Sequence, residues 1–115
     1  MAESNVEITE LIKRIHESGA LGRSSTYPRL LDYLVEQARS GQSCSEVDLA
    51  ENVFFKSDTF DQTSDSSVRV YVHNLRKKLQ LYYEGAGQKE SHRIHIPKGE
   101  YRVEILDAEN YAKVL

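Results

Sequence analysis

The sequence predicts a mainly α-helical domain that ends in a β-hairpin. Four segments within the first 83 residues repeat apolar side chains at the three- and four-residue spacing of helices packed on one face. Residues 93–105 instead alternate apolar and polar side chains around the turn Pro97-Lys98-Gly99-Glu100, which is typical of two short strands. The chain has 115 residues, enough for one hydrophobic core and too few for two.

Three helices are predicted in the first half of the chain. The first spans residues 5–18 and stops at Gly19. The second has Pro28 in its first turn and ends before Gly41. The third starts at Ser43, which has capping-box spacing to Glu46. The expected buried positions are, in order, Ile8, Leu11, Ile12 and Ile15; Leu30, Leu31, Leu34 and Ala38; and Leu49, Ala50, Val53 and Phe54.

The fourth helix, residues 66–83, is the best-defined element of the sequence. A polar stretch, residues 56–65, precedes it, and Gly85-Ala86-Gly87 follows it as a predicted linker. One stripe of the helix is apolar and is expected to face the core. This stripe consists of Val68, Val72, Leu75, Leu79 and Tyr82.

The opposite face of the fourth helix has the chemistry that a reader of the DNA major groove needs. It carries Arg69, Val70, His73, Asn74 and Lys77, with Ser66 at its start. An arginine pairs with guanine, an asparagine pairs with adenine, and Val70 can contact a thymine methyl group. Two plainer interpretations stay open: a solvated charged face, and a Val70 packed against the loop or the first helix.

The distribution of charge supports a polyanionic partner, although the net charge of −3 does not. Residues 1–67 carry 6 Lys/Arg and 12 Asp/Glu, whereas residues 68–102 carry 8 Lys/Arg and 3 Asp/Glu. A domain divided in this way has one basic face that can meet nucleic acid. Arg93, Lys98 and Arg102 extend the basic segment into the hairpin, where they can reach a phosphate or the minor groove.

Three helices followed by a β-hairpin form the order of a winged helix-turn-helix. We therefore expect this domain over residues 26–105, with a wing at residues 92–105. Residues 1–25 would be an N-terminal helical extension, and residues 106–115 a short tail helix. The first helix, through Ile8, Leu11, Ile12 and Ile15, would either pair with a second copy in a homodimer or cap its own core.

Two segments resemble the output domains of OmpR/PhoB-type response regulators and of ToxR- and CadC-like regulators. Ser66-Ser-Val-Arg-Val-Tyr-Val-His-Asn-Leu-Arg-Lys-Lys-Leu79 resembles the recognition helix, and Arg93-Ile-His-Ile-Pro-Lys-Gly-Glu-Tyr-Arg102 resembles the wing. The resemblance covers about residues 26–105, and residues 1–25 depart from it because that family has a small sheet there. The wing also resembles winged-helix modules at the N-termini of larger bacterial proteins, which would make the chain part of a longer one. The resemblance implies base contacts by Arg69, Val70, His73 and Asn74, phosphate contacts by Ser66, Arg76, Lys77, Lys98 and Arg102, and contact of loop 56–65, with Asp58 and Asp61, with RNA polymerase.

No catalytic site, cofactor or metal site is predicted. His92 and His95 are close in sequence but have no third ligand nearby, and no Gly-rich phosphate loop follows a strand. Cys44 is the one cysteine; a helix start can lower a thiol pKa, but no base is placed beside it. No apolar run reaches the length of a membrane span, and no signal peptide is seen, so we expect a cytoplasmic protein.

The sequence thus predicts a transcriptional regulator that binds specific sequences of double-stranded DNA. The alternative is a winged-helix module for protein interaction or dimerisation that does not bind DNA.

Overall fold

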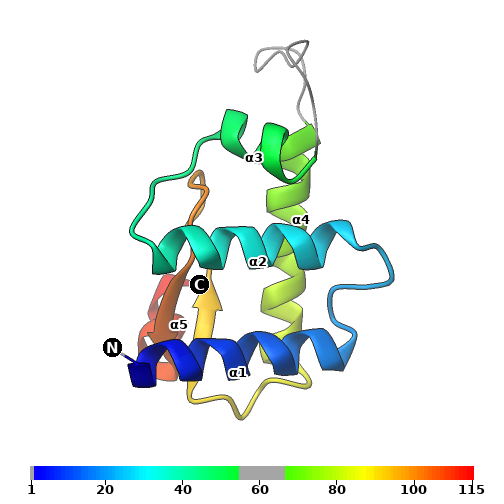
Figure 1. The fold of residues 1–115 in the computed structure, drawn as a ribbon. Coiled ribbons are helices and arrows are strands. Elements are labelled where there is room, and N and C mark those ends of the chain that lie inside the picture. The colour runs from blue at the N-terminus through cyan, green and yellow to red at the C-terminus, as the bar shows by residue number, and fades with distance from the viewer. Residues whose placement is uncertain (1, 55–66) are drawn as a thin grey trace.

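Figure 1 shows the computed structural model of the chain, which describes residues 2–54 and 67–115. The described part is mainly helical and has a two-stranded antiparallel sheet near its C-terminal end, which confirms the predicted class. The elements are α1 (Ala2–Ser18), α2 (Thr26–Arg39), α3 (Glu46–Asn52), α4 (Ser67–Glu84), β1 (His92–His95), β2 (Glu104–Asp107) and α5 (Ala108–Val114).

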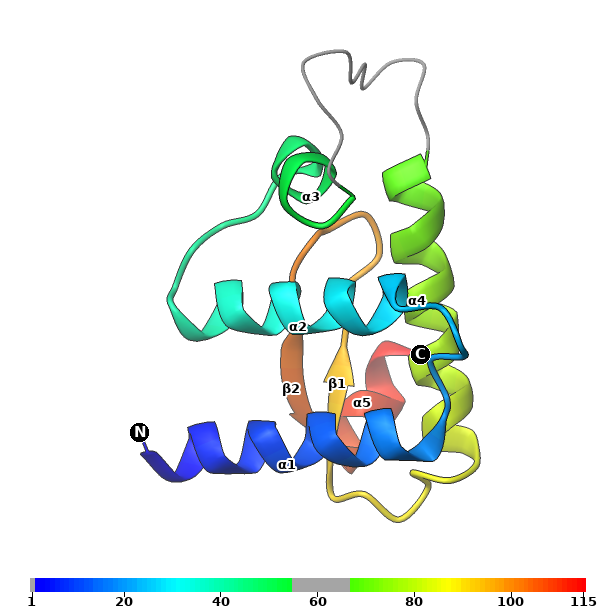
Figure 2. The same cartoon turned by 45° about the vertical axis from the view of Figure 1, so that its right-hand side comes forward.

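The helices and the sheet enclose one hydrophobic core. Figures 1 and 2 show α1 and α2 side by side, with α4 running crosswise to both and the hairpin behind them. The predicted stripe of α4 is confirmed, since its five side chains are all buried. The stripe of α2 is confirmed at its three leucines, whereas Ala38 is exposed because it lies in the last turn of α2, beyond the buried residues.

The first and last helices belong to this same core. Leu11 and Ile15 of α1 are 2% and 0% exposed, and Tyr111 of α5 is also buried. Burying a leucine or isoleucine side chain stabilises a fold by roughly 1.5–3 kcal/mol, so α1 contributes substantially to stability. The segments predicted as an N-terminal extension and a tail therefore complete the core of residues 26–105.

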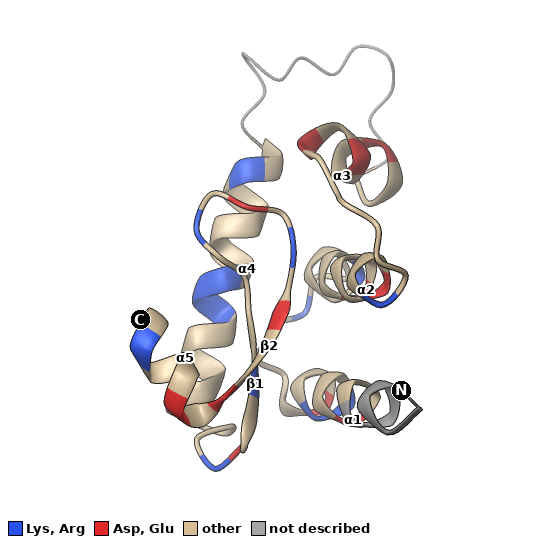
Figure 3. Cartoon of the chain, turned by 90° about the vertical axis from the view of Figure 1, so that its left-hand side faces the viewer, with Lys and Arg blue, Asp and Glu red and all other residues tan. Residues whose placement is uncertain are grey.

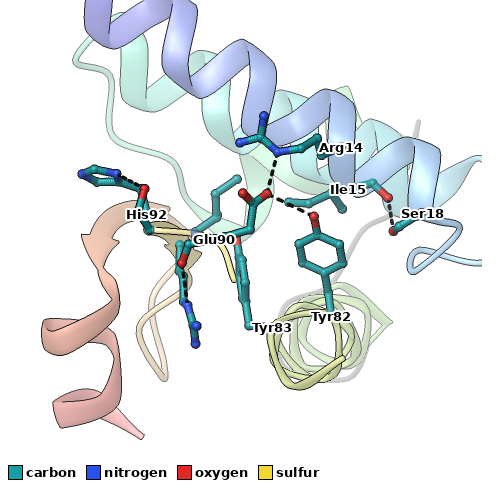
Figure 4. A network of polar contacts seen from close by, with 10 residues as sticks. Arg14, Ile15, Ser18, Tyr82, Tyr83, Glu90 and His92 are labelled. Atoms are coloured by element: carbon teal, nitrogen blue, oxygen red, sulfur yellow. Dashed lines mark hydrogen bonds and ion pairs between the residues drawn. The ribbon is translucent and has the colours of Figure 1, made fainter. Parts of the chain in front are cut away.

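A polar network ties α1 to the connection between α4 and β1 (Figure 4). The Arg14 Nε donates to Glu90 Oε2 at 2.7 Å, and the Tyr82 hydroxyl donates to the same oxygen at 3.2 Å. Burial is the main cause that raises the pKa of Tyr82, and the neighbouring Glu90 charge adds to it. Nearby, the buried backbone N–H of Ile94 donates to the Tyr83 hydroxyl at 2.8 Å.

In the segment predicted as a linker, Gly85 and Ala86 are exposed, whereas Gly87 is packed against α4. The Gly87 N–H donates to the Tyr82 carbonyl at 2.7 Å, and Gly87 itself is buried. A Cβ added to Gly87 would lie 2.7 Å from Tyr82 Cδ2, too close for two carbon atoms. Glycine is present here because the backbone lies against a tyrosine ring.

The start of α3 differs from the prediction by two residues. Ser45, not Ser43, is the N-cap: its side chain accepts from the Asp48 N–H, and Asp48 Oδ2 accepts from the Ser45 N–H at 2.9 Å. Both serines have an acidic residue three positions later, so the pattern alone does not choose between them. As a result, Glu46 lies in the first turn of α3 and its side chain reaches α4.

The connection between the two strands of the hairpin is also longer than predicted. Its strands pair from His92↔Asp107 to His95↔Glu104, and residues 96–103 form the connection, where a four-residue turn at 97–100 was expected. The ladder stops because the Ile96 and Pro97 carbonyls accept from Arg76 and because proline has no N–H to donate. Ile96 and Val103 at the two ends of the connection are buried in the core.

Candidate nucleic-acid interface

The outer face of α4 is the centre of the candidate site. Opposite the buried stripe, Arg69, Val70, His73 and Lys77 are all exposed, and the Val70 residue is 51% exposed. These are four of the side chains predicted to contact DNA. Ser66, at the start of the predicted face, lies outside the described residues, as does the loop with Asp58 and Asp61.

Arg69 is held at the start of α4 by the first turn of α3. Its Nη1 donates to Glu46 Oε1 at 3.1 Å and to Glu46 Oε2 at 3.3 Å. The carboxylate is the more buried partner, because the Glu46 side chain is 11% exposed and the Arg69 side chain is 44% exposed. The two partners are 23 positions apart in the sequence, and this pair was not predicted.

Asn74 lies at the border between α4 and α2. Its amide N–H donates to the Tyr27 hydroxyl at 3.2 Å, and the side chain is half-buried. Tyr27 in turn lies against Tyr71, with ring centroids 5.3 Å apart, and under Lys78, whose Nζ is 4.9 Å from the Tyr27 centroid. A bidentate contact with adenine uses the amide oxygen and one N–H, so the second N–H of Asn74 can keep its bond to Tyr27.

Arg76 holds the hairpin connection against α4. Its Nε donates to the Ile96 carbonyl at 2.8 Å, and its Nη2 donates to the Pro97 carbonyl at 3.3 Å. Burial lowers the pKa of Arg76, and the nearby Tyr101 partly opposes this effect. The resemblance placed this side chain on phosphate, but in the structure it has a positioning role, because it fixes where Lys98 lies relative to α4.

The connection carries both basic and acidic residues and lies beside α4 (Figure 3). Lys98 is exposed, and the following Gly99 has a φ of +80°, a conformation that glycine adopts without strain. Arg102, also exposed, donates to Glu100 Oε1 at 2.7 Å and lies 4.0 Å from Glu104. Among the described residues Lys98 forms no ion pair, whereas Arg102 is paired with Glu100 and Glu104.

Arg93 lies at the other end of the hairpin. Its Nη2 donates to the Gln88 carbonyl at 2.9 Å, and its guanidinium carbon lies 5.4 Å and 5.2 Å from the ring centroids of Tyr83 and Tyr111. These cation–π contacts join β1 to α4 and α5. In this arrangement Arg93 stabilises the base of the hairpin, away from the tip where a DNA contact was predicted.

The four isoleucine and leucine residues predicted for partner binding divide into two pairs. Leu11 and Ile15 pack inside the core, so their side chains are not available to a second copy in this fold. Ile8 and Ile12 are half-buried and line shallow hollows along α1 and α2. For Leu11 and Ile15, the alternative in which the first helix covers the core of its own chain therefore agrees with the structure.

Burial perturbs the pKa values of Cys44 and His95. Burial, with the Asp48 charge as a smaller cause, raises the pKa of Cys44 to about 11, although the residue lies just before a helix. His95 has its pKa lowered by burial. Among the described residues, no three His, Cys, Asp or Glu side chains are grouped so that they could bind a metal ion.

Comparisons with protein-family models, with curated proteins and with solved structures find no match to this chain. None of the helices in residues 2–54 and 67–115 combines the length and apolar character that a membrane span requires.

Proposed function

We propose that the chain is a winged helix-turn-helix domain that binds specific sequences of double-stranded DNA and regulates transcription. In this proposal α2, α3 and α4 are the three core helices, and the hairpin with its 96–103 connection is the wing. The observation that carries it is the outer face of α4, where Arg69, Val70, His73 and Lys77 are exposed together.

The dimensions of α4 suit the major groove. The helix has 18 residues, so it is about 27 Å long, and a helix with its side chains is roughly as wide as the groove. Arg69, Val70 and His73 lie in its first two turns, the part of a recognition helix that meets base edges. Lys77, one turn further on, would contact phosphate.

The hairpin tip supplies the second contact. Because Arg76 hydrogen-bonds to the carbonyls of Ile96 and Pro97, the neighbouring Lys98 is held beside α4. Lys98 would then reach the DNA backbone or the minor groove next to the major groove that α4 occupies. A contact of loop 56–65 with RNA polymerase stays a prediction from the resemblance alone.

The experiment that tests this proposal compares two substitutions on two kinds of DNA. A randomised duplex library is first enriched with the wild-type protein, and Kd is then measured for enriched and random duplexes. Arg69→Ala is expected to weaken enriched DNA by about 1–3 kcal/mol and to relax the preference at one base. Lys98→Ala is expected to weaken both duplexes alike and to lower the salt slope by about one unit. Equal loss on both duplexes for Arg69→Ala would contradict base reading by this residue.

A second candidate is a protein-interaction module, and one observation favours it. Val70 and Leu81 are 51% and 66% exposed and, eleven residues apart, lie on the same side of α4. Exposed apolar side chains aligned on one helix face suit a protein partner, including a second copy. This candidate predicts a concentration-dependent dimer in sedimentation equilibrium that Leu81→Ser dissociates, with no binding of any duplex.

A further inference from the structure

The pair formed by Glu46 and Arg69 joins the two helices that lie at the candidate interface. Both carboxylate oxygens of Glu46 accept from the same Arg69 nitrogen, at 3.1 Å and 3.3 Å. The exposed fractions, 11% for the Glu46 side chain and 44% for Arg69, place the carboxylate behind the guanidinium as seen from solvent.

The start of α3 and its packing on α4 fix this geometry. The capping box between Ser45 and Asp48 sets where α3 begins, and α3 packs against α4. In the hairpin connection, burial mainly raises the pKa of Tyr101, and the charges of Glu46 and Arg69 act on it in opposite directions. The Glu46 carboxylate, which accepts from Arg69, is therefore placed by the packed part of the fold.

We infer that Glu46 is a positioning residue that makes Arg69 a reader of base edges and not a phosphate anchor, an inference that rests on the proposed DNA binding. If Arg69 swung toward a phosphate, a largely desolvated carboxylate would lose this partner, which is unfavourable. The pair is also neutral as a unit, so it adds little to the long-range attraction for a polyanion.

The chemistry of guanidinium allows both contacts at once. An arginine side chain carries five N–H donors in a rigid planar fork, and Nη1 makes both hydrogen bonds to the Glu46 carboxylate. Recognition of guanine requires two donors directed at its O6 and N7 atoms. With the plane of the fork held by Glu46, those two donors have a defined direction, so a misplaced or wrong base is rejected.

Two substitutions of Glu46 separate its position from its charge. Glu46→Gln removes a negative charge, so binding to random duplex should tighten several-fold. It also weakens the hydrogen bonds that hold Arg69, so the ratio of Kd for random DNA to Kd for enriched DNA should fall about tenfold. Glu46→Asp keeps the charge but shortens the side chain by one methylene. It should lower the same ratio without tightening the binding of random duplex.

A matched control removes the same charge elsewhere on the helix. Glu51 is an exposed residue of α3, and Glu51→Gln is expected to leave the ratio unchanged. Thermal melting of each variant establishes that the protein tested is folded. The ratio is also measured in the Arg69→Ala background, where Glu46→Gln should have no further effect, because the group that it positions is gone.

The Kd measurements use the full chain and the duplex enriched by the wild type. The inference is supported if both Glu46 variants lower the ratio of Kd for random DNA to Kd for enriched DNA. Glu51→Gln should leave this ratio unchanged, and Glu46→Gln should leave it unchanged when Arg69 is already alanine. An unchanged ratio in the Glu46 variants, or an equal fall with and without Arg69, overturns it while the proposed DNA binding stands. A wild-type protein that binds no duplex, or all sequences alike, overturns the proposed function and this inference together.

Discussion

Replacing Arg76 by alanine should loosen the hairpin from α4 and lower the stability of the whole domain. The Nε and Nη2 groups of Arg76 donate to the Ile96 and Pro97 carbonyls at 2.8 Å and 3.3 Å. Arg76→Ala removes both bonds. Ile96 is buried in the core, so its carbonyl is poorly placed to find water instead.

The expected loss follows from these two contacts. A hydrogen bond from a charged donor contributes about 1.5–3 kcal/mol net, and a contact as long as 3.3 Å contributes less. We therefore expect Arg76→Ala to lower the free energy of unfolding by about 2–4 kcal/mol. For a chain of 115 residues, each kcal/mol corresponds to about 4 °C in Tm, so the predicted shift is about 8–16 °C.

Thermal unfolding followed by circular dichroism, together with urea titration, measures this loss. Lys77→Ala is the matched control: it alters the next residue of α4, which is exposed, and should change stability by no more than about 0.5 kcal/mol. If Arg76→Ala melts within about 2 °C of Lys77→Ala, the hydrogen bonds to the connection do not stabilise the fold and this reasoning is refuted.

Two further predictions concern the packed connection and the cysteine. Gly87→Ala should destabilise the protein by about 1–3 kcal/mol in urea titration, because the added Cβ would overlap the Tyr82 ring. Gly85→Ala is the control and should change stability much less, because its Cβ meets its nearest atom at 3.5 Å. Equal effects of the two substitutions would contradict the close packing at Gly87. Burial raises the pKa of Cys44 to about 11, so little of its thiol is ionised at pH 8. Iodoacetamide should therefore alkylate Cys44 at pH 8 about a hundredfold more slowly in the folded protein than in urea-unfolded protein. Equal rates would show that burial does not protect the thiol.

Periodicity was sufficient to predict which side of α4 is buried. Helical spacing alone places Val68, Val72 and Leu75 on one side, and the opposite side must then face solvent in a chain with a single core. For the same reason the exposure of Val70, His73 and Lys77 could be predicted without knowledge of the neighbouring elements.

Side chains on the borders of that face could not be assigned in the same way. Asn74 bonds to Tyr27, and Arg76 bonds to the hairpin connection, because of where α2 and residues 96–103 pass by α4. Those paths depend on tertiary packing, and the sequence around Asn74 or Arg76 contains no record of them. The resemblance predicted a phosphate contact for Arg76 and gave no sign of its hydrogen bonds to the connection.

The pair of Glu46 and Arg69 was missed for a local reason. Ser43 and Ser45 both fit a capping box, and choosing Ser43 made Glu46 a capping residue whose side chain turns back on its own helix. Once Ser45 is the cap, Asp48 completes the capping box and Glu46 can reach Arg69. A shift of two residues at a helix start thus decides what the candidate base reader contacts.

The central claim is that the outer face of α4 binds DNA. Fluorescence anisotropy with a random-sequence duplex tests it most directly. The titration runs between about 50 and 200 mM salt, the range where phosphate contacts weaken steeply. Lys77→Glu reverses a charge on this face, and Lys89→Glu makes the same reversal at an exposed position in the connection after α4. The proposed function predicts binding that falls steeply with salt, is lost in Lys77→Glu and persists in Lys89→Glu. No binding at about 50 mM salt, or an equal loss in the two variants, would contradict it.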